Sequence, residues 1–175
     1  SVPKSGDKKK LIELSERNAK FYRIDKLKQI KIVDPEAHGI RIMEQAKRDL
    51  QLKNQPLQIE CFDNSNLMGT NPVASCVVFK NGKPSKKDYR HFKIKNIEGP
   101  DDFASMEQVI SRRLSRLLKE NKPLPNLIIV DGGKGQLSAG LKSIKKLKLE
   151  KKVAIIGIAK KLEEIFKPND KLPLY

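Results

Sequence analysis

The chain has 175 residues, which is enough for one domain with a short extension and too few for two large domains. Lys and Arg number 37 against 21 Asp and Glu, and this net charge of +16 indicates a polyanionic partner: nucleic acid first, with ribosomal RNA, an acidic membrane surface or plain solubility as alternatives. The two cysteines lie in apolar runs, which excludes a disulfide framework and a zinc site and fits a reducing cytoplasm. The sequence has no membrane-spanning run and no signal-peptide core, which excludes a membrane protein.

Residues 1–56 are polar, basic and helical in pattern, and we expect them to form an extension of the domain that follows. One amphipathic helix is predicted to begin near Asp7, and a second is predicted to begin around residues 34–36 and to end before Pro56. Because the segment has few large apolar residues, we expect it to pack along the next domain rather than to form its own core. The absence of an initiating Met and the abrupt end at Tyr175 indicate a piece of a longer protein.

From residue 57 onward the pattern becomes that of a sheet, and we expect one domain over residues 57–175. Strands are predicted over residues 57–62, 73–79, 89–94, 127–130 and 153–159, and helices over 101–120 and 136–147. Asn81-Gly82 is a hairpin signal after the second strand. This order predicts an α/β fold in which a mixed sheet, an antiparallel three-strand meander plus parallel later strands, is flanked by helices.

Two aspartates stand where predicted strands end, Asp63 after the first strand and Asp131 after the fourth. In open α/β sheets, ligands bind at the carboxyl ends of the strands. A lone aspartate at such a position is usually a turn-former or a helix cap. Two of them in one sheet of a very basic chain favour a site for Mg²⁺ or Mn²⁺, because carboxylates hold such ions and the ions allow phosphodiesters to be cut without a covalent nucleophile.

The segment from Asp131 to Gln136 reads Asp-Gly-Gly-Lys-Gly-Gln. Glycines at this density allow a tight turn and a close approach to a ligand, and the N-terminus of the helix that follows is able to accept a phosphate. A strand-to-helix turn without a ligand is the alternative. The spacing and the residues after the last glycine do not match a nucleotide-binding phosphate loop.

Other charged residues have two interpretations each. Asp101 and Asp102 either stabilise the start of a helix or bind a metal, and the first role is the more common one. Arg112, Arg113 and Arg116 form either a solvated face or a track for phosphates. His91 lies in an alternating strand and is interpreted as a surface or packing residue rather than a catalytic base.

Several separate strings of the sequence resemble the endonuclease domain of the UvrC family of excision-repair proteins, and they occur in the order in which that family carries them. The most diagnostic string is Ile129-Val130-Asp131-Gly132-Gly133-Lys134-Gly135-Gln136-Leu137. The others are residues 59–63, 72–79, 89–92, 99–106, 112–113, 158–161 and 163–166. The resemblance extends to the opening segment at residues 6–11 and spans nearly the whole chain.

The resemblance implies an RNase H-like fold and the incision of damaged double-stranded DNA on the 5′ side of a lesion, in nucleotide excision repair. It implies UvrB as a partner, with UvrA acting upstream, and neither a membrane nor a small-molecule substrate. It places the catalytic carboxylates at Asp63 and Asp131, which the strand pattern also singles out, and a third acidic position at Asp102.

The family's third catalytic residue is a histidine on a helix beyond the last strand, and neither His38 nor His91 matches it. The family's N-terminal nuclease domain, UvrB-binding segment and terminal helix-hairpin-helix motifs do not occur in the sequence either. We therefore expect a C-terminally truncated domain that folds and binds DNA, binds metal weakly and cuts poorly.

We expect Asp63 and Asp131 to hold Mg²⁺ or Mn²⁺ while basic side chains contact the DNA phosphates. The candidate contacts are Arg90, Arg112, Arg113, Lys134 and Lys160. A non-catalytic DNA-binding module of the same fold is the first alternative, and it predicts that the aspartates can be neutralised without loss of function. A structural or assembly domain is the second alternative, and it predicts no salt-sensitive affinity for DNA.

Overall fold

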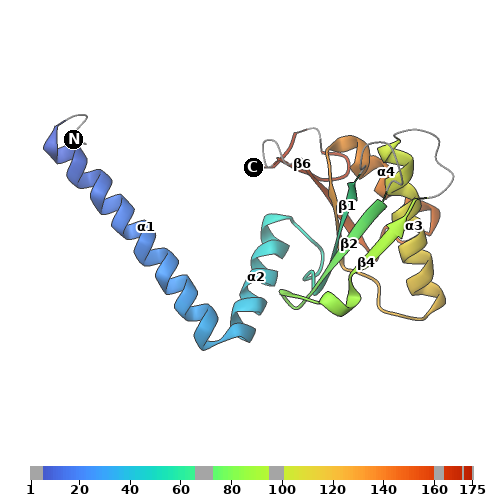
Figure 1. The fold of residues 1–175 in the computed structure, drawn as a ribbon, viewed down its shortest axis with the longest axis horizontal. Coiled ribbons are helices and arrows are strands. Elements are labelled where there is room, and N and C mark those ends of the chain that lie inside the picture. Colours follow the sequence, from blue (N-terminus) through green and yellow to red (C-terminus); the bar gives the residue numbers. More distant parts are fainter. Residues whose placement is uncertain (1–5, 66–72, 95–100, 160–163, 171, 175) are drawn as a thin grey trace. The chain divides into compact units, whose positions relative to one another are not determined.

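The computed structural model describes residues 6–65, 73–94, 101–159, 164–170 and 172–174, and it divides the chain into two compact units, Ser1–Ile42 and Met43–Tyr175 (Figure 1). The predicted division of the chain at residue 56 stays a prediction, because these units are defined by contacts rather than by independent folding. Among the described residues, no helix combines the length and the apolar character needed to cross a membrane.

The two helices predicted before residue 56 are confirmed as α1 (Asp7–Val33) and α2 (Pro35–Asp49). The second begins where Asp34 Oδ1 accepts hydrogen bonds from the backbone N–H groups of Glu36 (3.1 Å) and Ala37 (2.9 Å). An aspartate at this cap and a proline at the first helical position both favour a helix start.

A mixed sheet forms the centre of the second unit, as predicted, and it has seven strands where five were predicted. Its strands are β1 (Gln58–Ser65), β2 (Val73–Lys80), β3 (Lys83–Pro84), β4 (Arg90–Lys93), β5 (Leu127–Asp131), β6 (Ala154–Ala159) and β7 (Glu164–Phe166). The order is β3-β2-β1-β5-β6-β7, with β4 also paired to β2. β1, β5 and β6 run parallel, whereas β2, β4 and β7 each run antiparallel to a neighbour. The meander and the later parallel strands are therefore confirmed.

The predicted hairpin follows β2. Asn81 and Gly82 have φ values of +50° and +73°, and the pairing of Lys80 with Lys83 leaves only these two residues in the turn. Positive φ at both central residues is the geometry that matches the twist of paired strands. The sequence analysis did not predict β3, the 3₁₀ turn at Lys86–Asp88 or β7, because elements of two or three residues are too short to show a periodic pattern.

Helices α3 (Asp102–Lys119) and α4 (Lys134–Lys146) lie side by side on one face of the sheet (Figure 1). The apolar core lies between these helices and the sheet. It includes Phe62, Ala74, Val78, Ile128, Val130 and Ile155 from the strands, and Met106, Val109, Ile110, Leu114, Leu137 and Ile144 from the helices. Gly140 of α4 allows the close packing of the two layers, since a Cβ there would lie 2.6 Å from the Ile155 side chain.

The two cysteines are free thiols, as the composition predicts. Cys76 is buried on the helix side of the sheet, and Cys61 is half-buried. Burial, with a smaller contribution from the neighbouring Glu60 carboxylate, raises the pKa of Cys61 to about 11 and raises that of Cys76 further. Both thiols therefore stay protonated near neutral pH.

Candidate functional site

Asp63 and Asp131 lie beside each other on neighbouring strands. β1 and β5 run parallel with Phe62 opposite Val130, and each aspartate is the next residue along its strand. Side chains alternate between the faces of a strand, so both aspartates project from the face opposite to the buried Phe62 and Val130. Because adjacent strands are separated by about 4.8 Å, the two carboxylates are within reach of one ion. Asp63 is exposed and Asp131 is half-buried.

The same face of the sheet continues across β2 and β4. Ser75 lies opposite Asp63, and His91 lies opposite Ser75. His91 is therefore two strand spacings, about 10 Å, from Asp63, and it is exposed. At this separation it does not share an ion held between the aspartates, which agrees with its interpretation as a surface residue. His38 lies in α2, outside the sheet.

The N-terminus of α3 lies against the end of β1. Asp101 caps the helix, because its Oδ1 accepts hydrogen bonds from the backbone N–H groups of Phe103 (3.0 Å) and Ala104 (2.9 Å). Asp102 is the first helical residue, and its backbone carbonyl accepts a hydrogen bond from Nδ2 of Asn64 (3.0 Å). The capping role thus belongs to Asp101, while Asp102 lies beside the strand end that carries the first aspartate.

The Asp-Gly-Gly turn after β5 packs tightly on β6. The N–H of Gly132 donates to the carbonyl oxygen of Ile158 (2.8 Å). A Cβ on Gly157 would lie 2.7 Å from the carbonyl oxygen of Gly132, so the turn comes close to β6 only because that position is glycine. α4 then begins at Lys134, two residues before its predicted start, with Gly133 at the cap and no side-chain hydrogen bond there.

Gly157→Ala is expected to lower the free energy of unfolding by about 1–3 kcal/mol, because the new methyl group meets backbone that cannot move aside easily. Gly133→Ala is the matched control in the same turn. Gly133 has a φ of −78°, and a Cβ there has no neighbour within 4 Å. Urea denaturation of the three proteins measures the difference, and equal midpoints for both variants would contradict the close approach.

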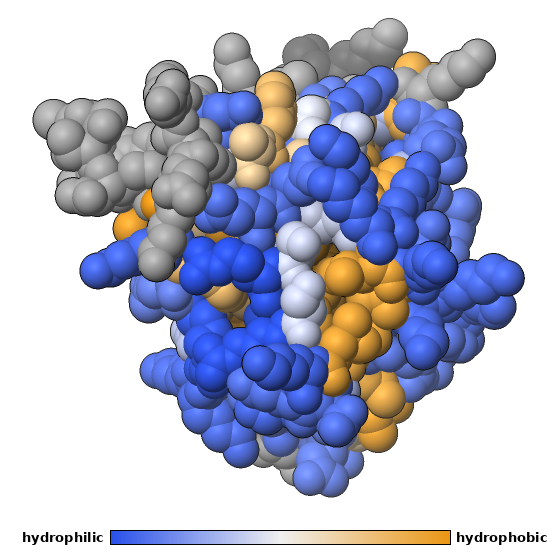
Figure 2. Space-filling model, turned by 90° about the vertical axis from the view of Figure 1, so that its right-hand side faces the viewer, coloured by the Kyte–Doolittle hydropathy of each residue, from blue (hydrophilic) through white to orange (hydrophobic). Residues whose placement is uncertain are grey.

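Two of the predicted DNA contacts are exposed on the surface. Lys134 is exposed at the start of α4, with its ammonium 5.6 Å from the centre of the Phe166 ring. Arg112 is exposed on α3, where its Nη1 donates to the carbonyl oxygen of Lys93 (2.8 Å) and its guanidinium lies over the Phe92 ring. Figure 2 shows a largely hydrophilic surface, with apolar areas between the hydrophilic ones, on the side where these helices lie.

The other three predicted contacts are Arg90, Arg113 and Lys160. Arg90 is half-buried, and its Nη1 donates to the carbonyl oxygens of Lys87 (3.0 Å) and Tyr89 (2.6 Å). Lys160 lies outside the described residues. Arg113 is only 6% exposed, which corrects the expectation that it contacts phosphate.

The guanidinium of Arg113 is held inside the domain by Glu60, which is fully buried on β1. Nε donates to Oε2 (2.9 Å) and Nη2 donates to Oε1 (2.7 Å), so the pair is bidentate. Gln58 also donates from Nε2 to Oε1 of this carboxylate (3.1 Å), and the Cys76 thiol lies 3.7 Å from Oε2. The ion pair joins β1, three residues before Asp63, to the middle of α3.

The sequence analysis missed the roles of Glu60, Asn64 and Phe103. A signal for Glu60 exists, because it alternates with the inward-facing Phe62 on β1. The matching signal for Arg113 is its place in the apolar stripe of α3, seven residues after Met106. No local pattern identifies Asn64 or Phe103, since their contacts join segments far apart in the sequence.

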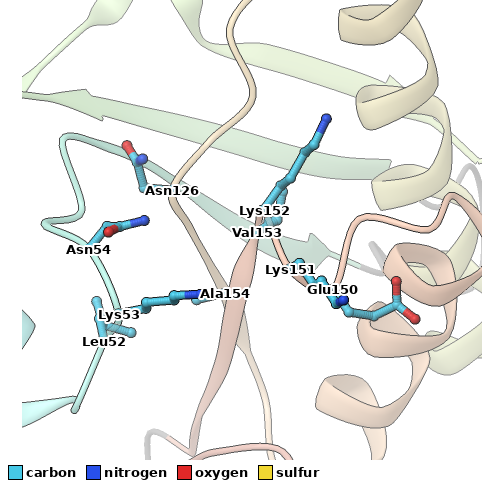
Figure 3. Close-up of a pocket in the computed structure, with 9 residues that line it drawn as sticks. All are labelled: Leu52, Lys53, Asn54, Asn126, Glu150, Lys151, Lys152, Val153 and Ala154. Atoms are coloured by element: carbon cyan, nitrogen blue, oxygen red, sulfur yellow. The ribbon is translucent and has the colours of Figure 1, made fainter.

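A cavity of about 420 Å³ lies at the other edge of the sheet, where β5 and β6 begin (Figure 3). Lys53, Lys151 and Lys152 line it together with Asn54 and Asn126. In Figure 3 the carboxylate of Glu150, which also lines the cavity, points away from the other labelled residues. Neither strand-end aspartate lines this cavity, so it is separate from the candidate site.

Comparison with known families gives a match over most of the chain. Residues 47–175 match the family described as "UvrC RNAse H endonuclease domain". This match includes both strand-end aspartates and the whole sheet.

Curated proteins called "UvrABC system protein C" are similar to the chain over 99% to 100% of its length. The protein from Flavobacterium psychrophilum is 69% identical over 175 residues, and that from Flavobacterium johnsoniae is 67% identical over 175 residues. The protein from Porphyromonas gingivalis is 57% identical over 174 residues. The chain spans 29% of the length of each of these relatives.

Among solved structures, endonuclease V of Ciona intestinalis in complex with an inosine-containing DNA is similar at 16% identity with a TM-score of 0.46. The similarity covers 69% of this chain and 58% of that chain.

Proposed function

Because the chain belongs to the UvrC RNase H endonuclease domain family, we propose that it is the metal-dependent nuclease module that makes the 5′ incision in damaged DNA during nucleotide excision repair. The observation that carries this proposal is the placement of Asp63 and Asp131 side by side on one face of parallel strands. A lone carboxylate has a simpler explanation as a turn or cap residue, whereas two at adjoining positions provide the ligands of a cation site.

The residues present fit a hard divalent ion. Asp63 and Asp131 would hold Mg²⁺ or Mn²⁺ through carboxylate oxygens, and within the described ranges no group of three His, Cys, Asp or Glu side chains forms a metal site. When bound, such an ion supplies an activated water and stabilises negative charge on a phosphate. The chain's own contribution is to fix the two carboxylates on adjacent strands and to leave Asp63 exposed to the substrate.

Positive charge around these carboxylates supports DNA as the substrate. The first turn of α4 lies at this edge of the sheet, and because no side chain caps it, its backbone N–H groups favour phosphate. Lys134 and Arg112 add exposed cations, and the net charge of +16 attracts DNA over a longer range. The partners in this proposal are UvrB, with UvrA acting upstream, in the cytoplasm.

Calorimetric titration of the chain with Mn²⁺ tests the metal site without requiring activity. Asp63→Asn and Asp131→Asn are each expected to weaken Mn²⁺ binding by at least about tenfold, because each removes a charged ligand. Asp101→Asn is the control, since this carboxylate caps α3 and asparagine caps equally well. Equal Mn²⁺ affinity in all four proteins would refute the site.

A further inference from the structure

Phe103 is the second residue of α3, and 55% of its surface is exposed. The apolar stripe of the same helix, from Met106 to Leu117, is buried against the sheet, so Phe103 does not belong to it. Single exposed apolar residues are common on protein surfaces. The position of this ring at the candidate site, and the glycine that receives it, distinguish it from such residues.

The ring lies against Gly135, in the first turn of α4. A Cβ built on Gly135 would lie 2.3 Å from Cε1 of Phe103 and 2.6 Å from its Cζ. The ring can occupy this place only because residue 135 has no side chain. One side of the aromatic ring is thereby held against the backbone of α4, while the rest of it is exposed to solvent.

Contacts on both sides connect Phe103 to the two strand-end aspartates. On one side, its neighbour Asp102 accepts a hydrogen bond from Asn64, which directly follows Asp63. On the other side, Gly135 lies four residues after Asp131 in the turn that begins α4. The ring therefore lies between the N-termini of the two helices, at the edge of the sheet where the proposed metal ligands end their strands.

We propose that Phe103 stacks against a base of the DNA strand whose phosphate is bound at Asp63 and Asp131. This inference rests on the proposed function. Cations and helix N-termini hold the phosphates but carry no contact for a base, whereas an exposed aromatic ring offers a surface that every base can stack on. A fixed ring also holds one nucleotide of the DNA strand in place, and this positions the phosphate next to the two carboxylates.

The chain contains no tryptophan, so Phe103→Trp introduces a single fluorophore at the proposed contact. Stacking on a base is expected to quench its emission when a duplex oligonucleotide with a central unpaired stretch is added. Leu118→Trp is the matched control, because Leu118 is 42% exposed on the same helix, about four turns away. Its emission is expected to stay unchanged, while fluorescence anisotropy of the labelled DNA reports binding in both variants.

Phe103→Ala provides the corresponding affinity measurement. We expect DNA binding to weaken by about 5- to 100-fold, the range for loss of one base–aromatic stack. The slope of log affinity against log salt should stay that of the wild type, because no charge is lost. Lys134→Gln is expected to reduce that slope by about 1, which separates a stacking contact from a phosphate contact.

The outcomes separate this inference from the proposed function. The DNA anisotropy could rise while the tryptophan emission of neither Phe103→Trp nor Leu118→Trp changes. DNA then binds the protein but does not contact this ring, and only the stacking inference fails. If neither the anisotropy nor the emission responds to DNA at low salt, both the inference and the proposed nuclease function are overturned.

Discussion

Asp63→Asn and Asp131→Asn are each expected to reduce 5′ incision of a lesion-containing duplex by on the order of 10³-fold in the full-length protein that carries this domain. A bound divalent ion contributes several kcal/mol of transition-state stabilisation, and about 4 kcal/mol corresponds to that factor. Asparagine has nearly the shape of aspartate, so the change removes a charged ligand while it keeps the packing of the strand end. Single-turnover rates with end-labelled DNA, together with the partner proteins, give the measurement.

The control for this experiment is Asp101→Asn, which keeps the cap of α3 and should leave the incision rate near that of the wild type. DNA binding should persist in both strand-end variants, because they lose negative rather than positive charge. A wild-type incision rate for either strand-end variant would instead favour a non-catalytic DNA-binding module of the same fold.

The second large effect concerns the buried ion pair between Glu60 and Arg113. Glu60→Gln is expected to lower the free energy of unfolding by about 3–5 kcal/mol, because it leaves a guanidinium buried without its countercharge, and arginine cannot escape by losing its proton. Arg113→Met should be similarly destabilising. Chemical denaturation followed by circular dichroism measures both losses.

The double variant Glu60→Gln/Arg113→Met gives the decisive comparison, since it removes both charges together. Its loss of unfolding free energy should be smaller than the sum of the two single losses, because no buried charge is left unpaired. Glu120→Gln serves as the surface control: Glu120, the C-cap residue of α3, pairs with Arg116 and Lys122 at the surface, and such pairs contribute little. Additive losses in the double variant would show that the two side chains act independently.

The sheet, and the position of the two aspartates at strand ends, could be predicted from the sequence because their signals are local. An apolar run followed by an acidic residue marks a strand end, and the parallel order of β1 and β5 brings Asp63 and Asp131 together. The burial of Arg113 also has a local signal, its place in the apolar stripe of α3, whereas its partner has none. Only the docking of α3 on β1 decides that Arg113 meets Glu60.

Two contacts could not be predicted from the sequence either. They are the hydrogen bond from Asn64 to Asp102 and the packing of Phe103 on Gly135. Each contact joins two segments whose separation along the chain exceeds thirty residues. Their formation depends on the final angle between strand and helix, which many side chains determine together. These long-range contacts are nevertheless what assembles separate strand ends and helix starts into one site.

The thiol of Cys76 beside the Glu60 carboxylate has a chemical consequence for the domain. The thiolate, rather than the thiol, reacts with peroxides, and both burial and the adjacent negative charge keep this sulfur protonated by raising its pKa. The sulfur that touches the ion pair is thereby protected from conversion to sulfenic acid.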